Sequence, residues 1–107
     1  MAMLAMCMPI LPGKLEKWNA MMDQVKSTPD FAKSREDAGV HERTFVQHTN
    51  SGDFIIITLE GENPAASWAI ITANMPPEFA EFALDVHGLD INQTPPLLPE
   101  LVFDSRE

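Results

Sequence analysis

Apolar and polar positions alternate most clearly over residues 40–61, VHERTFVQHTNSGDFIIITLEG, a pattern that predicts two β-strands and a tight turn. Both flanks are rich in Val, Ile, Thr and Phe, which favour strands. Asn50-Ser51-Gly52 is a turn cluster, and Gly52 can take the left-handed backbone that a three-residue hairpin loop needs. A β-hairpin is therefore the clearest element that the sequence predicts.

Before the hairpin, apolar spacing predicts one strand and one longer helix. Residues 2–10 are apolar on both faces, which is typical of a central strand covered on both sides. Residues 15–27 follow a helical period, so one stripe of this helix should pack on the sheet. That stripe consists of Leu15, Trp18, Met22 and Val25.

A second, shorter helix is predicted between this one and the hairpin. Thr28-Pro29 has the sequence of an N-cap followed by a first helical position. The helix should cover residues 30–38 and end at Gly39, which suits a left-handed C-terminal residue.

Two helices and a last strand are predicted after the hairpin. Asn63-Pro64 repeats the cap-and-proline signal and opens a helix to about Ala73. Prolines at 76 and 77 interrupt it, and a further helix ends at His87-Gly88. A proline-rich connection through Pro95 and Pro96 then leads to a strand over residues 100–104.

The predicted order is β, α, β, β, α, β, with each helical region broken in two. This order is the ferredoxin-like arrangement, an α+β fold with a four-stranded antiparallel sheet and helices on one face. A chain of 107 residues fits a single domain spanning residues 1–107.

The second hairpin strand indicates what covers the other face of that sheet. Ile55, Ile57 and Leu59 should meet the helices, which turns Phe54 and Ile56 outward. Large apolar residues on an exposed face usually mark an interface. We therefore expect a homodimer whose two sheets pack face to face.

Three stretches carry a family resemblance: REDAGVHERTFVQHTNSGDFIIITLEG, EFALDVHGLDI and the proline-led last strand. Together they resemble small uncharacterised bacterial proteins of the dimeric α+β barrel superfamily. The resemblance implies ferredoxin-like subunits that pair their sheets into a shared barrel. Haem-degrading members use an Asn on the first strand, a Trp and a His; this first strand has no Asn, and no family residue is carried over.

Charge and composition restrict the partners. Sixteen acidic residues against seven basic ones give a net charge of −9, which argues against nucleic acid and anionic membranes. The single cysteine, Cys7, lies in an apolar run and should be a small buried residue. The N-terminus lacks the positive region of a signal peptide, so a cytoplasmic location is expected.

The candidate catalytic residues are His48 and Arg43, on the first hairpin strand. His48 could act as a general base, and Arg43 could hold a carboxylate or enolate oxygen. A three-residue loop would pair His48 with Phe54 and place it inside the barrel. A two-residue loop would pair it with Ile55 and move it to the helix side. Alternatively, Arg43 simply forms an ion pair with Glu60 or Glu42.

Candidate ligand-binding residues are Phe45, His41 and Trp68. Phe45 and His41 share the strand face of Arg43, and Trp68 could stack on a ligand. No metal site and no cofactor are expected, since histidines 41, 48 and 87 show no metal-binding spacing.

Two functions remain after these exclusions. The first is a homodimeric protein that binds a small aromatic or aliphatic molecule in an apolar cavity, for which seven Met and six Phe provide adaptable walls. The second is a cofactor-independent monooxygenase or isomerase, which requires His48 and Arg43 to converge on one enclosed cavity. A purely structural or partner-binding dimer cannot be separated from the first by sequence.

Overall fold

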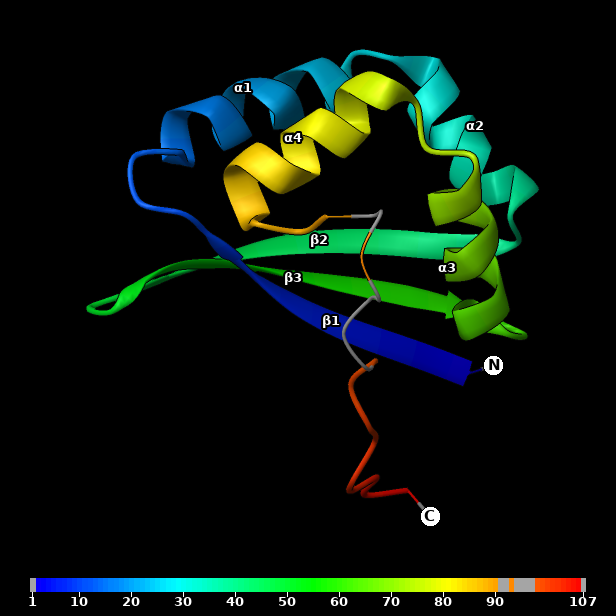
Figure 1. Ribbon diagram of the computed structural model, residues 1–107. Helices are drawn as coiled ribbons and strands as arrows, with labels where there is room; N and C mark the ends of the chain where they lie inside the picture. Colours follow the sequence, from blue (N-terminus) through cyan, green and yellow to red (C-terminus); the bar gives the residue numbers. More distant parts are fainter. Residues whose placement is uncertain (1, 91–92, 94–97, 107) are drawn as a thin grey trace.

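The computed structural model describes residues 2–90, 93 and 98–106 and shows an antiparallel sheet with four helices on one of its faces (Figure 1). The elements are β1 (Ala2–Ile10), α1 (Leu15–Lys26), α2 (Pro29–Asp37), β2 (Val40–Thr49), β3 (Gly52–Gly61), α3 (Pro64–Ala73) and α4 (Pro77–His87). The α+β class, the predicted hairpin and the predicted helices are confirmed, and residues 2–10 form a strand, but β1 lies at the edge of the described sheet with one face exposed and is not a central strand covered on both sides.

Local signals explain where most helices begin and end. The Asn63 side chain accepts a hydrogen bond of 3.2 Å from the Ala66 amide, which caps α3 as expected. Gly88 follows α4 with φ of 70°, a left-handed conformation that suits glycine. Thr28 is the N-cap residue of α2 and Pro29 its first helical residue, as predicted, although the Thr28 hydroxyl donates to the Gln24 carbonyl of α1 at 2.8 Å and does not cap α2.

The sheet has the order β1-β3-β2, and its hairpin register differs from both predicted ones. His48 pairs with Asp53, not with Phe54 or Ile55, across a two-residue Asn50-Ser51 loop. Gly52 takes a φ of 125°, so it can pair with Thr49 directly at the end of the turn. This register puts His48 on the helix side of the sheet.

The fourth strand predicted over residues 100–104 is wrong for this chain. Residues 98–106, the C-terminal arm, form no strand, and the described sheet has three strands. The arm leads away from the helical layer and past β1 (Figure 1). Leu101-Val102-Phe103 has the composition of a strand, but such a segment forms a strand only where a second strand can pair with it. The predicted connection through Pro95 and Pro96 lies outside the described residues.

The core lies between the sheet and the helices. Ile55, Ile57 and Leu59 of β3 face it as predicted, and Leu59 and Val86 are fully buried. The other buried apolar members are Leu4, Met6, Ile10, Trp18, Val40, Ile71 and Phe82. Lys17 and Lys14 both pair with Asp85, which links α1 to α4 across the top of this core and holds the pKa of that carboxyl below its usual range.

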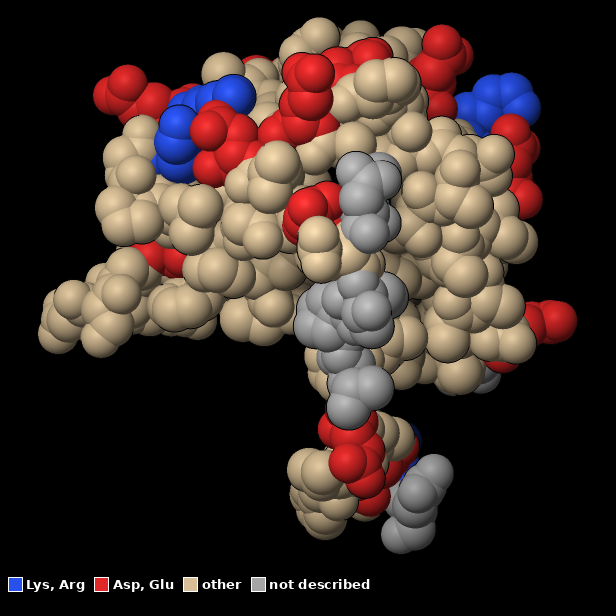
Figure 2. Space-filling model, in the orientation of Figure 1, with Lys and Arg blue, Asp and Glu red and all other residues tan. Residues whose placement is uncertain are grey.

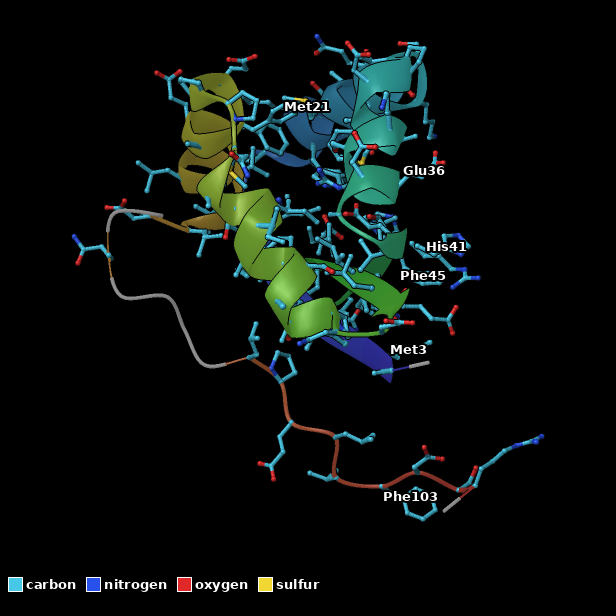
Figure 3. All side chains as sticks on the ribbon, turned by 90° about the vertical axis from the view of Figure 1, so that its right-hand side faces the viewer. Met3, Met21, Glu36, His41, Phe45 and Phe103 are labelled. Atoms are coloured by element: carbon cyan, nitrogen blue, oxygen red, sulfur yellow. The ribbon has the colours of Figure 1, made fainter. Side chains whose placement is uncertain are left out.

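Among the described residues, no helix covers the opposite side of the sheet, the open face. Its central rows, aligned across the three strands, are Cys7–Ile56–Phe45, Ala5–Thr58–Arg43 and Met3–Glu60–His41. Met3 is 56% exposed and Phe45 53% exposed, and both stand with His41 along the same side of the sheet (Figure 3). The expected burial of Cys7 is not found in this chain, where β1 alternates between core and solvent.

Candidate functional site

A cavity of about 620 Å³, the helix-side cavity, lies between the sheet and the four helices. Its size is in the range that holds a small organic molecule. Most of its wall is apolar: Met8, Met21, Met22, Ile55, Ile57, Trp68, Ile71, Met75, Phe79 and Phe82. Methionine side chains are flexible, so such a wall can adapt to the shape of a guest.

A more polar outer groove of about 1060 Å³ lies beside α1, α2 and β2. It contains exposed charged residues such as Asp23, Lys26 and Glu36. The two hollows share one wall, formed by Trp18, Met22, Val25, Thr28, Phe31, Arg35, Glu42 and Thr44. A molecule entering from the outer groove would therefore meet this wall first.

An ion pair lies at the centre of the shared wall. Arg35 Nε of α2 donates to Glu42 Oε1 of β2 at 2.8 Å, with the two side chains only 18% and 13% exposed. The guanidinium also lies 3.9 Å from the centre of the Phe31 ring, a cation–π arrangement. Because the two charges compensate each other, the wall presents no unpaired charge to the cavity.

Sequence reasoning missed Arg35 as the partner of Glu42 and considered Glu42 only as one of two possible partners for Arg43. The available signal was on the helix, where Phe31 and Arg35 are four residues apart and so lie on one face. Arg43 instead approaches Glu60 on the open face, with Nη1 3.7 Å from Oε1. Of the two predicted partners of Arg43, Glu60 and Glu42, Glu60 is thus the one observed.

Trp18 brings an unsatisfied polar group to the same wall. The residue is 6% exposed, and its Nε1–H is buried with no hydrogen-bond acceptor among the described residues. Burial of a donor without an acceptor costs about 1–3 kcal/mol. Neighbouring side chains seal this N–H, so a guest with an oxygen acceptor could remove that cost only after the indole shifts toward the cavity that Trp18 lines.

His87 adds a second polar group, at the end of α4. Its Nδ1 lies 2.7 Å from the Pro9 carbonyl, which can only accept, so Nδ1 carries the proton and Nε2 is an acceptor. Burial lowers the pKa of the imidazole, and the hydrogen bond to Pro9 offsets part of that shift. The ring, packed edge-on against Phe82, is therefore neutral at pH 7.

This environment predicts a pH dependence of stability. Because the folded pKa of His87 lies below the unfolded value near 6.5, the unfolded state takes up the proton first as the pH falls. Stability should decrease from about pH 6.5 downward until the folded group also titrates. We expect His87→Gln to reduce this decrease in urea unfolding measured at pH 7.5 and 5.5. Equal pH dependence in both proteins would contradict this assignment.

The predicted catalytic residues lie on opposite faces of the sheet. His48 is on the helix side at the exposed hairpin end, where its Nδ1 contacts Asp53 Oδ1 at 2.7 Å. Arg43 is on the open face beside Glu60. The structure does not bring these two side chains to one enclosed cavity, which was the condition for the enzyme hypothesis.

The three predicted ligand-binding residues also separate. Trp68 of α3 lines the helix-side cavity and packs against the core. Phe45 lies on the open face, and His41 is on that face at the border of the outer groove. Trp18 and His87, which sequence reasoning assigned to core or capping roles, also line the cavity.

Metal and membrane features can be assessed for the described part of the chain. Within it, no three His, Cys, Asp or Glu side chains gather in a way that could hold a metal ion. None of its helices combines the length and apolarity needed to cross a bilayer. On the face shown in Figure 2, acidic residues are scattered over the helical layer, with Lys and Arg near its two ends.

Comparison with protein-family models, with curated proteins and with solved structures finds no match to this chain. The functional argument therefore depends on the cavity and the open face themselves.

Proposed function

We propose that this protein binds a small, neutral, mainly apolar molecule in the helix-side cavity. The observation that carries the proposal is the buried Nε1–H of Trp18, which lacks an acceptor at the wall of an apolar cavity of about 620 Å³. A shift of the Trp18 side chain toward the cavity would let an oxygen acceptor on the ligand satisfy this donor, and the flexible methionines would adjust around the remaining surface.

The charges around the cavity select the class of ligand. The Arg35–Glu42 pair is internally compensated, so it offers no spare charge to a ligand. Asp30 and Glu78 are exposed acidic residues among the lining, whereas Asp37, also in the lining, pairs with Lys33. An anion such as a fatty acid would be repelled there. The favoured ligand is a ketone, ester or similar neutral compound with an aromatic or aliphatic body.

Replacement of Trp18 tests this ligand class. We expect the wild type to bind the neutral fluorescent ketone prodan about fivefold more tightly than 2-(dimethylamino)naphthalene, which lacks the propionyl group and its ketone oxygen, because one neutral hydrogen bond contributes about 1 kcal/mol. In Trp18→Phe this ratio should fall to about one. Fluorescence titration of both compounds measures it.

Trp68→Phe is the matched control, because Trp68 lines the same cavity from α3. That variant should change the affinity for both compounds together and keep their ratio. A wild type that binds neither compound, or a ratio unchanged in Trp18→Phe, would rule out the proposed contact. Native mass spectrometry of the protein purified from cells would then identify any retained natural ligand.

We also propose that two copies associate through their open faces, as in the dimeric α+β barrels. The support is the row Cys7–Ile56–Phe45 and the exposed Met3, which place apolar side chains where a single chain meets water. Such association leaves the helix-side cavity free, because the cavity lies on the opposite side of the sheet. Dimerisation without ligand binding would favour the structural or partner-binding alternative.

A further inference from the structure

We infer that the C-terminal arm of one copy adds to the β1 edge of a second copy and supplies that copy's fourth strand. This inference rests on the proposed dimer but concerns a different surface, the edge of the sheet. It is built on two features, an apolar strand edge without a neighbour and an apolar arm that its own chain leaves uncovered.

β1 is the edge strand to which the arm would add. Within the described residues it pairs with β3 on one side only, so the backbone groups on its outer side lack a sheet partner. Residues 2–10 contain no charged side chain, whereas the other edge strand, β2, carries Glu42 and Arg43. An apolar segment therefore suits the uncharged edge strand β1 better than the charged edge strand β2.

The connections over the sheet select the same edge. Helices α1 and α2 join β1 to β2, and helices α3 and α4 follow β3 on the same face. Connections of this kind are right-handed in almost all proteins. Within one chain, two right-handed crossovers over one face would place the strand that follows α4 beside β1 and not beside β2. In the exchanged dimer the same segment of the second copy takes that place.

The arm has the composition of that strand but not its position. Leu101, Val102 and Phe103 are 70%, 87% and 77% exposed, although they are among the most strand-prone residues of the chain. Pro99 precedes them, and proline is tolerated at the first position of a strand. In both views the arm stands below β1, away from the helices, with Phe103 far from every other labelled side chain (Figures 1 and 3).

A second copy fits this arrangement better than any other occupant. The arm extends on the side where the partner's sheet would lie if the open faces pack together. A twofold axis would then let each copy give one arm and receive one, which is domain exchange of an identical element. Both unpaired backbones become hydrogen-bonded, as in strand addition to a sheet edge.

Cysteine cross-linking tests this pairing, because the wild-type chain has a single exposed thiol, Cys7 on β1. A tagged chain carrying Cys7→Ser and one of Leu101→Cys, Val102→Cys or Phe103→Cys is mixed with untagged wild type and oxidised mildly. We expect a heterodimer of tagged and untagged chains. Its yield should alternate along the arm, with Leu101→Cys and Phe103→Cys on one side of Val102→Cys, because strand side chains alternate between faces.

Equal yields at the three positions, or no heterodimer, would overturn strand addition. An internal disulfide in monomers of Val102→Cys that retain Cys7 would also overturn it, since the arm would then pair within its own chain. Deletion of residues 98–107 should raise the dimer dissociation constant at least tenfold in sedimentation experiments. An unchanged constant would refute the arm contact but keep the open-face dimer, whereas a monomeric wild type would refute the dimer itself.

Discussion

Arg35→Met should lower the free energy of unfolding by about 3 kcal/mol, because it leaves Glu42 without its cation at a site where the carboxylate side chain is only 13% exposed. Loss of one partner of a buried ion pair costs more than the pair itself contributes. For a domain of this size the melting temperature should fall by roughly 12–24 °C. Chemical and thermal unfolding followed by circular dichroism measure both quantities.

Two companion variants separate the buried charge from other effects. Lys33→Met breaks an exposed pair on the helix side, with Asp37 and an N–O distance of 3.2 Å, so it should change stability by less than about 0.5 kcal/mol. The double variant Arg35→Met/Glu42→Met removes both charges and should regain most of the lost stability. If the double variant is as unstable as Arg35→Met alone, the loss comes from packing around Phe31 and not from the unpaired carboxylate.

The orientation of β3 could be predicted from sequence because every second residue is large and apolar. Ile55, Ile57 and Leu59 bury against the helices whatever the exact turn, since burial alone fixes which face is inside. The pairing of His48 could not be predicted in this way. One residue more or less in the loop changes its partner, and the composition of Asn50-Ser51-Gly52 fits several loop lengths.

The fourth strand shows a different limit of local pattern. Leu101-Val102-Phe103 has the composition of a strand, but a strand exists only when a second one pairs with it. Among the described residues these three have no strand beside them, so they form no strand despite their composition. Only the pairing of all three described strands shows that β1 lies at an edge of the sheet and pairs with β3 alone.

Only part of the candidate site could be predicted from the sequence. A helical stripe correctly placed Trp18 against the sheet, and that packing is also what deprives its Nε1–H of water. Whether Nε1–H finds an acceptor depends on all the side chains packed around the indole. The spacing of apolar residues in the sequence does not give those neighbours. The pair of Arg35 and Glu42 likewise joins a helix to a strand and follows from their packing.

Ile56→Asp should abolish the proposed dimer, with a dissociation constant at least about 100-fold higher than that of the wild type. Ile56 lies at the centre of the open face, between Cys7 of β1 and Phe45 of β2. In a twofold dimer the change would bury two carboxylates without counter-ions in an apolar contact, which is strongly unfavourable. Sedimentation velocity across a dilution series measures the constant.

The single chain should tolerate this change, because Ile56 points away from the core that Ile55 and Ile57 help to build. An aspartate in a strand costs on the order of 1 kcal/mol, so circular dichroism should still show a folded protein. Leu84→Asp is the matched control, since Leu84 is 51% exposed on α4, on the helix side of the molecule. If Ile56→Asp and Leu84→Asp both leave a stable dimer, the contact uses neither the open face nor α4, and the face-to-face proposal is wrong. If only Ile56→Asp yields a folded monomer, the open face is the interface, and the helix-side cavity must be reached from the other side of the sheet.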